Sequence, residues 1–164
     1  MRFAEGTSVS MGKSRGEIDD LLRAWGCNGV SWLDDYEAGM VQLQFRWARD
    51  DAAGARLVYL ARFTLRLPSE AALRERAIDG RTKRFSPTKL DALRKANGQQ
   101  EHRVLLLWLK AAFNAVDAGI VDAATIFLPF LVGADGQTVA DVAVPKLAKL
   151  LRGSATQLLS GPAA

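Results

Sequence analysis

Two neighbouring stretches of alternating residues limit most strongly what this chain can fold into. Between residues 41 and 47, and again between residues 57 and 66, apolar side chains occupy every second position. A period of two is typical of a β-strand with one buried face. Because only the short polar segment 50–54 separates the two stretches, we expect them to pair as an antiparallel hairpin. The hairpin then has one apolar and one polar face.

A helix and a further strand are expected before this hairpin. Ser14 and Glu17 have the spacing of a capping box, and apolar residues follow at helical intervals as far as Trp25. Gly26 stands where a left-handed helix cap would be, and residues 30–33 predict a strand. The first half of the chain is therefore predicted as one helix followed by a three-stranded antiparallel meander.

The second half of the chain is predicted to be helical. Ser86-Pro87 is a helix start, and residues 100–118 predict a long apolar helix. Thr138 and Asp141 have the spacing of a cap for a last helix, which we expect to run towards Leu151. Helices of this kind cover the apolar face of a sheet, so the fold class is α+β, with the helical C-terminal half packed on one sheet face.

Length and composition indicate a single domain. A chain of 164 residues buries a sizeable core, and we assign residues 1–152 to one α+β domain and residues 153–164 to a flexible tail. The longest apolar stretch, residues 104–116, contains Lys110 and Asn114, so it is too polar to span a membrane, and it offers a surface for forming a homo-oligomer. The aromatic core is expected to contain Trp25, Phe45, Trp47, Phe63 and Trp108.

The residues that support enzyme or metal chemistry are few. Cys27 is the only cysteine and His102 the only histidine, which excludes a disulfide within the chain and a metal site with several histidines, and favours a reducing, cytoplasmic setting. His102 is interpreted as a partly exposed helix residue and Cys27 as a small packed one. The Gly12-Lys13-Ser14 segment lacks the spacing of a phosphate-binding loop. We therefore predict no catalytic residue, no cofactor and no metal.

The polar face of the hairpin is the main candidate for binding. If the apolar residues of both strands share one side, three arginines and two glutamines are brought together on the other, and that face is expected to lack carboxylates. A basic loop between the hairpin and the long helix is expected nearby. Such a surface suits a phosphate backbone. The predicted nucleic-acid-binding residues are Gln42, Gln44, Arg46, Arg62 and Arg66 on the sheet, and Arg81, Lys83 and Arg84 in the loop.

Three segments resemble a family of short uncharacterised proteins encoded by bacteriophages and prophages. They are Lys13-Ser14-Arg15-Gly16-Glu17-Ile18, Leu65-Arg66-Leu67-Pro68 and Asp135-Gly136-Gln137-Thr138-Val139. The resemblance spans most of the chain, and its motifs are a helix cap, a strand end and a turn. It implies a phage or mobile-element protein in a bacterial cytoplasm, and it brings no binding or catalytic residue with it.

Three functions remain open from the sequence. The first is a non-catalytic accessory protein that binds nucleic acid through the basic sheet face and loop, as the net charge of +4 favours. The second is a protein-interaction module that inhibits or modulates a host protein, for which an exposed apolar patch would be the sign. The third is a divalent-metal nuclease built from the acidic clusters Asp19-Asp20, Asp34-Asp35-Glu37 and Asp50-Asp51, although these clusters lie in predicted turns or on a helix surface.

Overall fold

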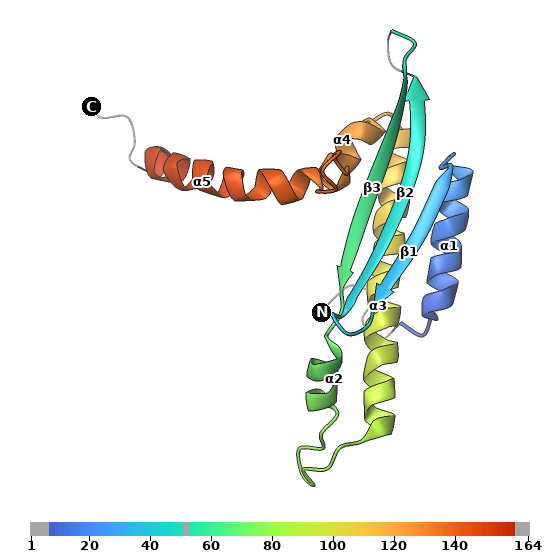
Figure 1. Cartoon of the computed structure of the whole chain (residues 1–164), viewed down its shortest axis with the longest axis vertical. Coiled ribbons are helices and arrows are strands. Elements are labelled where there is room, and N and C mark those ends of the chain that lie inside the picture. Colours follow the sequence, from blue (N-terminus) through green and yellow to red (C-terminus); the bar gives the residue numbers. More distant parts are fainter. Residues whose placement is uncertain (1–6, 51–52, 160–164) are drawn as a thin grey trace.

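The protein is seen in a computed structural model that describes residues 7–50 and 53–159, with side chains described up to Lys149. A helix precedes three strands, and helices make up the rest of the described chain (Figure 1). The elements are α1 (Met11–Ala24), β1 (Gly29–Asp35), β2 (Met40–Asp50), β3 (Arg56–Arg66), α2 (Glu70–Arg76), α3 (Pro87–Asp117), α4 (Ala123–Phe127), the 3-10 turn η1 (Leu128–Phe130) and α5 (Val139–Leu159).

The three strands form one antiparallel sheet in the order β1-β2-β3, which confirms the predicted meander and the α+β class. Leu43 on β2 lies opposite Trp32 on β1 and Phe63 on β3. This register places the apolar positions of the hairpin on one face, as their period of two predicts. Both α1 and α3 contribute to the core on that face, and in Figure 1 α3 runs behind the strands while α1 lies beside β1.

The first helix begins one turn earlier than the sequence predicts. The hydroxyl of Ser10, not of Ser14, caps it by accepting a hydrogen bond from the amide of Lys13 at 3.2 Å. Ser14 is buried inside the helix, and Glu17 accepts from Arg103 at 3.3 Å instead of completing a capping box. Two serines four residues apart both fit a cap, and packing against α3 selects the one that stays exposed. Gly26, with φ of 94°, does end the helix region as predicted.

The core lies between the sheet and the helices α1, α3 and α4. Phe45, Trp47 and Phe63 are buried as predicted, and Phe127 from α4 lies among them with ring centroids 5.6 to 6.3 Å away. The prediction for Trp108 is wrong, because 38% of this side chain is exposed. Its ring contacts the edge of the cluster, and its other side faces solvent. Trp25 is half-buried against the same cluster.

One continuous helix replaces the two that the sequence predicts in the middle of the chain. α3 has 31 residues and begins at the predicted Ser86-Pro87 cap. The stretch 104–116 supplies five buried core residues, so most of the apolar surface predicted for homo-oligomer formation is covered by the sheet. The first turns of α3 extend past the sheet, where Leu90 packs with Leu73 and Ala77 in a second, smaller cluster.

The end of the described chain departs from the expected packing on the sheet. Val132 donates to the carbonyl of Leu60 at 2.8 Å, so this segment pairs with the edge of β3. Thr138 and Asp141 form the predicted reciprocal cap, with bonds of 2.9 and 3.1 Å. α5 then extends away from the sheet (Figure 1) and continues to Leu159, past the predicted start of the tail, while residues 160–164 lie outside the described residues.

Candidate nucleic-acid interface

The outer face of the sheet carries the five predicted side chains. The register pairs Gln44 with Arg62, Arg46 with Leu60 and Met40 with Arg66, and Gln42 follows the same alternation. Every one of the five therefore points away from the core, as the sequence predicts. Arg46 and Arg66 are exposed, and the other three are half-buried.

Arg46 lies flat on the sheet because its neighbour on β1 has no side chain. Gly29 pairs with Arg46, and a Cβ added at Gly29 would come within 2.7 Å of the Arg46 Nε atom. A side chain at this position would therefore displace the flexible Arg46 side chain, so Gly29 leaves room for the guanidinium to extend across β1. The position of this charge is thus determined by two strands together.

The outer face is not free of carboxylates, contrary to the prediction. Asp141, at the start of α5, lies 3.5 Å from the Arg62 guanidinium. The bonds that Asp141 accepts from the backbone and side chain of Thr138, and the charge of Arg62, lower the pKa of this carboxyl. Arg62 is therefore partly neutralised, because the reciprocal cap of α5 places an anion beside it.

The positive charge is concentrated in residues 70–95, which we call the basic extension. It contains eight basic and four acidic residues, so its surplus equals the net charge of +4 of the whole chain. The extension consists of α2, the loop after it and the first turns of α3, and it forms one end of the molecule (Figure 1). The rest of the chain has as many acidic as basic residues.

Asp79 organises the loop of the basic extension. One of its carboxylate oxygens accepts from the amides of Thr82 at 2.6 Å and Arg81 at 3.0 Å, and these bonds lower the pKa of the group. The backbone amide of Asp79 donates to the carbonyl of Arg84 at 2.8 Å, and Lys83 has φ of 56°. A non-glycine residue in this region is uncommon and needs support from its surroundings. The loop is thus a defined turn that exposes Arg81, Lys83 and Arg84.

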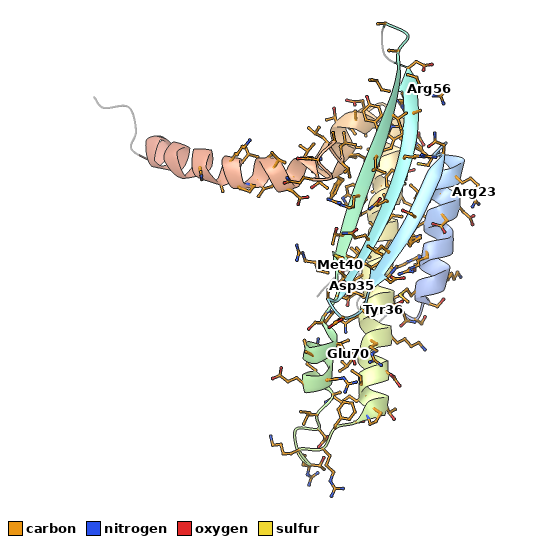
Figure 2. The ribbon with its side chains drawn as sticks, in the orientation of Figure 1. Arg23, Asp35, Tyr36, Met40, Arg56 and Glu70 are labelled. Carbon is orange, nitrogen blue, oxygen red and sulfur yellow. The ribbon has the colours of Figure 1, made fainter. Side chains whose placement is uncertain are left out.

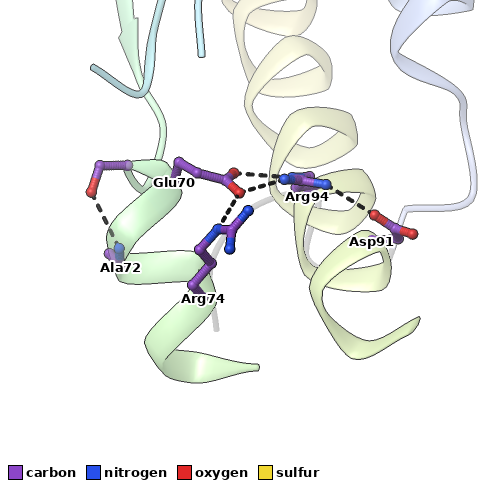
Figure 3. A network of polar contacts seen from close by, with 6 residues as sticks. Glu70, Ala72, Arg74, Asp91 and Arg94 are labelled. Atoms are coloured by element: carbon purple, nitrogen blue, oxygen red, sulfur yellow. Dashed lines mark hydrogen bonds and ion pairs between the residues drawn. The ribbon is translucent and has the colours of Figure 1, made fainter. Parts of the chain in front are cut away.

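An ion-pair network joins the two helices of the basic extension (Figure 3). Arg74 on α2 and Arg94 on α3 both donate to the same oxygen of Glu70, at 2.9 and 2.5 Å, and Arg94 also donates to Asp91 at 3.0 Å. The hydrogen bond from Arg94, followed by that from Arg74, lowers the pKa of Glu70. The network fixes α2 beside α3 and uses two of the eight positive charges, which leaves the loop cations outside it.

The sheet face and the loop do not form one surface. The loop lies beyond the far end of α2 (Figure 1), whereas Arg46 pairs with Gly29, the first residue of β1, away from the strand end of β3 that leads into α2. Arg66, at the end of β3, is separated from α2 by three residues and is the closest of the sheet arginines along the chain. The predicted residues therefore fall into two groups with Arg66 between them.

A buried polar network around His102 was missed from the sequence. His102 is fully buried, and its Nε2 accepts from Arg15 Nε at 2.9 Å while its Nδ1 lies 2.7 Å from the carbonyl of Gly98. Arg15 also makes a bidentate ion pair with Asp34, and Trp32 stacks on the imidazole. Burial lowers the pKa of His102, and the nearby Arg15 contributes to this. The prediction that His102 is partly exposed is therefore wrong.

This network has a structural role. The three side chains come from three elements, α1 for Arg15, β1 for Asp34 and α3 for His102. Their bonds therefore connect these elements within the body of the molecule, by which we mean the sheet and the helices α1, α3 and α4 around the large core. Both ring nitrogens of His102 are engaged and the side chain is out of reach of solvent. Burial also raises the pKa of the Cys27 thiol to about 12, which matches its interpretation as a packed residue.

Of the acidic clusters considered for a nuclease, Asp51 lies outside the described residues, and the others are described. Among residues 7–50 and 53–159 there is no group of three or more histidine, cysteine or acidic residues placed to hold a metal ion. None of the helices in that part of the chain combines the length and apolarity needed to cross a membrane.

Comparison of the chain with protein-family models, with curated proteins and with solved structures found no match. The function is therefore argued from the geometry of these surfaces.

Proposed function

We propose that this protein is a non-catalytic accessory protein that binds nucleic acid, with the basic extension as the principal contact. The observation that carries this proposal is the concentration of the whole positive surplus in residues 70–95, on exposed helix and loop positions. Clustered cations bind a phosphate backbone by releasing its counterions, with little dependence on sequence. The resemblance to phage and prophage proteins suggests the cytoplasm of a bacterial host as the setting.

The loop cations are assigned the strongest role. Arg81, Lys83 and Arg84 are exposed and have no ion-pair partner among the described residues, so binding a phosphate costs them no existing bond. Arg66 and Arg46 form a second, separate group of cations on the sheet, and Arg66 is the nearer of the two to the basic extension along the chain. Gln42 and Gln44 supply hydrogen bonds to sugars or bases. Arg62 contributes least, because Asp141 already pairs with it.

Fluorescence anisotropy of labelled oligonucleotides at several salt concentrations tests this proposal. We expect the log of the affinity to fall linearly with the log of the salt concentration. Arg81→Ala/Arg84→Ala should reduce that slope by about two, because each arginine that no longer binds a phosphate lowers it by about one. Arg46→Ala/Arg62→Ala, which removes the same charge from the sheet, is the matched control and should change the slope less. Absence of binding by the wild type at low salt would refute the proposal.

One observation favours a protein partner as the second candidate. α5 extends from the body with Val142, Val144 and Leu147 exposed, and exposed apolar residues on one element commonly mark an interaction site. A pull-down from a bacterial lysate with and without nuclease treatment separates the two functions. Capture of a protein after nuclease treatment that is abolished by Val144→Asp/Leu147→Asp would support the protein partner.

A further inference from the structure

A pocket of about 560 Å³ lies where the sheet meets the basic extension. It is formed by the start of α1, the turn between β1 and β2, the segment between β3 and α2, and one face of α3. In Figure 2 the labelled residues Asp35 and Tyr36 lie at this end of the sheet, with Glu70 beyond them on α2. Its volume falls within the range of roughly 300 to 1,000 Å³ that is common for small-molecule sites.

Close backbone packing holds the pocket open at a fixed shape. Gly39, in the turn after β1, accepts a hydrogen bond from the amide of Leu67 at 2.7 Å. A Cβ at Gly39 would lie 2.4 Å from the Leu67 carbonyl oxygen and 2.8 Å from the amide nitrogen of Ser69. Only a glycine fits there, so the two segments that form one side of the pocket are fixed against each other.

The amide of Gln99 is available inside this pocket. Gln99 lies on α3 among the lining residues, only 8% of it is exposed, and its side chain makes no hydrogen bond to any described residue. Among the described residues, the fully buried side-chain polar atoms without a partner are Ser14 Oγ and Trp47 Nε1, so the Gln99 amide is still accessible from the pocket that its residue lines. Its neighbour Asn97 on the same lining bonds Leu93 through the amide nitrogen, which leaves its carbonyl oxygen available. The pocket thus offers a donor and acceptors to a ligand.

The remaining lining suits a flat and uncharged group. Met11, Leu67, Pro68 and Leu73 supply apolar surface, and Tyr36, which is 67% exposed, adds an aromatic ring. The charges on the lining balance, since Asp35 and Glu70 oppose Arg94 and Lys95. Arg94 is moreover held by Glu70 and Asp91 (Figure 3). The pocket therefore favours neither an anionic nor a cationic ligand.

We propose that this pocket binds a nucleobase through the Gln99 amide, with the base turned out of a strand that lies along the basic extension. This inference rests on the proposed function for the source of the base. The pocket is lined by Leu67 and Pro68, which follow Arg66 in the chain, and by residues of α2 and α3 that belong to the basic extension, so a strand bound to the extension lies close to it. A nucleobase has a flat apolar face and an edge of donors and acceptors, which the apolar lining, Tyr36 and Gln99 complement.

The test measures how much of the affinity depends on bases. Fluorescence anisotropy compares short homo-oligonucleotides of each base with an abasic strand of the same length. We expect the preferred base to increase affinity roughly tenfold over the abasic strand, as one stacked base does. Gln99→Leu and Tyr36→Ala should remove this difference without weakening binding of the abasic strand. Gln100→Leu, at the next position of α3 and outside the pocket, is the matched control and should keep it.

Each result decides between the two proposals. Equal affinity of the wild type for all strands, including the abasic one, or a base preference that survives in both pocket variants, overturns the pocket while the proposed function stands. If no strand binds, the proposed function fails, and free nucleoside monophosphates are tested by thermal shift. A shift in the wild type that Gln99→Leu abolishes supports a site for free nucleotides. No shift overturns the nucleobase site altogether.

Discussion

The body of the molecule and its basic extension are stabilised in different ways. The body has a single large core in which Phe127 contacts aromatic rings from β2, β3 and α3, together with the buried His102 network. The extension has three buried apolar residues and ion pairs that are open to solvent. Apolar burial stabilises a fold far more than exposed ion pairs do. Stability thus resides in one region, whereas the positive charge resides in the other.

The largest expected effect is a core truncation in the body. Phe127→Ala removes a fully buried ring from the middle of the cluster, so the free energy of unfolding should fall by about 3 to 5 kcal/mol. Chemical denaturation followed by tryptophan fluorescence measures it. Leu128→Ala, at the next and exposed position, is the control and should cost about 0.5 kcal/mol or less. Similar losses in the two variants would mean that α4 does not seal the core.

A truncation in the basic extension should have a smaller and more local effect. Leu73→Ala opens the small cluster with Ala77 and Leu90 and is expected to cost about 2 kcal/mol, at the low end for buried leucines. Hydrogen exchange should accelerate in α2 and the first turns of α3, while the amides of β2 keep their protection. Equal acceleration in β2 would show that the two regions unfold as one unit and would abolish the contrast between them.

The stability of the body should vary with pH because of His102. Burial holds the pKa of this histidine below its unfolded value of about 6.5, so the unfolded chain takes up the proton first as pH falls. The contribution of the neutral, buried His102 to the free energy of unfolding is therefore fully present above that pKa and decreases as the pH falls below it. Denaturation at a series of pH values should show this decrease in the wild type and a flatter profile in His102→Gln. Identical profiles would contradict the role of His102.

The stability of the basic extension should decrease only at a lower pH than that of the body. Arg94 and Arg74 hold the pKa of Glu70 below its usual value near 4.3, so its contribution is present above that pH and is lost as pH falls further. We expect this to be the smallest effect, because the pair is exposed. The protection of the α2 amides, measured relative to their intrinsic exchange rate at each pH, should fall in acid in the wild type and already be lower at neutral pH in Glu70→Gln. Glu75→Gln, which lies outside the network, serves as the control.

The sequence predicts the elements whose pattern is local. The period of two in residues 41–47 and 57–66 determines the strands, their pairing and which side chains share a face, and all of these are confirmed. The caps at Ser86 and Thr138 are confirmed for the same reason. α2 was missed because its seven residues contain a single buried side chain, Leu73, which is too short a pattern to show a helical period.

What the sequence did not predict depends on contacts between distant segments. Arg15 and His102 are 87 residues apart, and nothing near either residue indicates that they meet. The pairing of Arg62 with Asp141 required α5 to begin at the edge of β3. The pocket around Gln99 is assembled from four separate segments of the chain. The concentration of basic residues between Arg74 and Lys95, by contrast, is evident from the sequence as a count along the chain.

If the protein binds nucleic acid as proposed, the unbroken course of α3 sets the length of strand that it covers. Its 31 residues span about 46 Å, and they connect the basic extension to the body that carries the sheet arginines. Moving one group of cations relative to the other would break hydrogen bonds within this helix. The number of nucleotides occupied per protein molecule should therefore stay constant as salt or protein density changes, unlike that of proteins which switch between binding modes. The length of α3 thus fixes the distance between the two groups of cations.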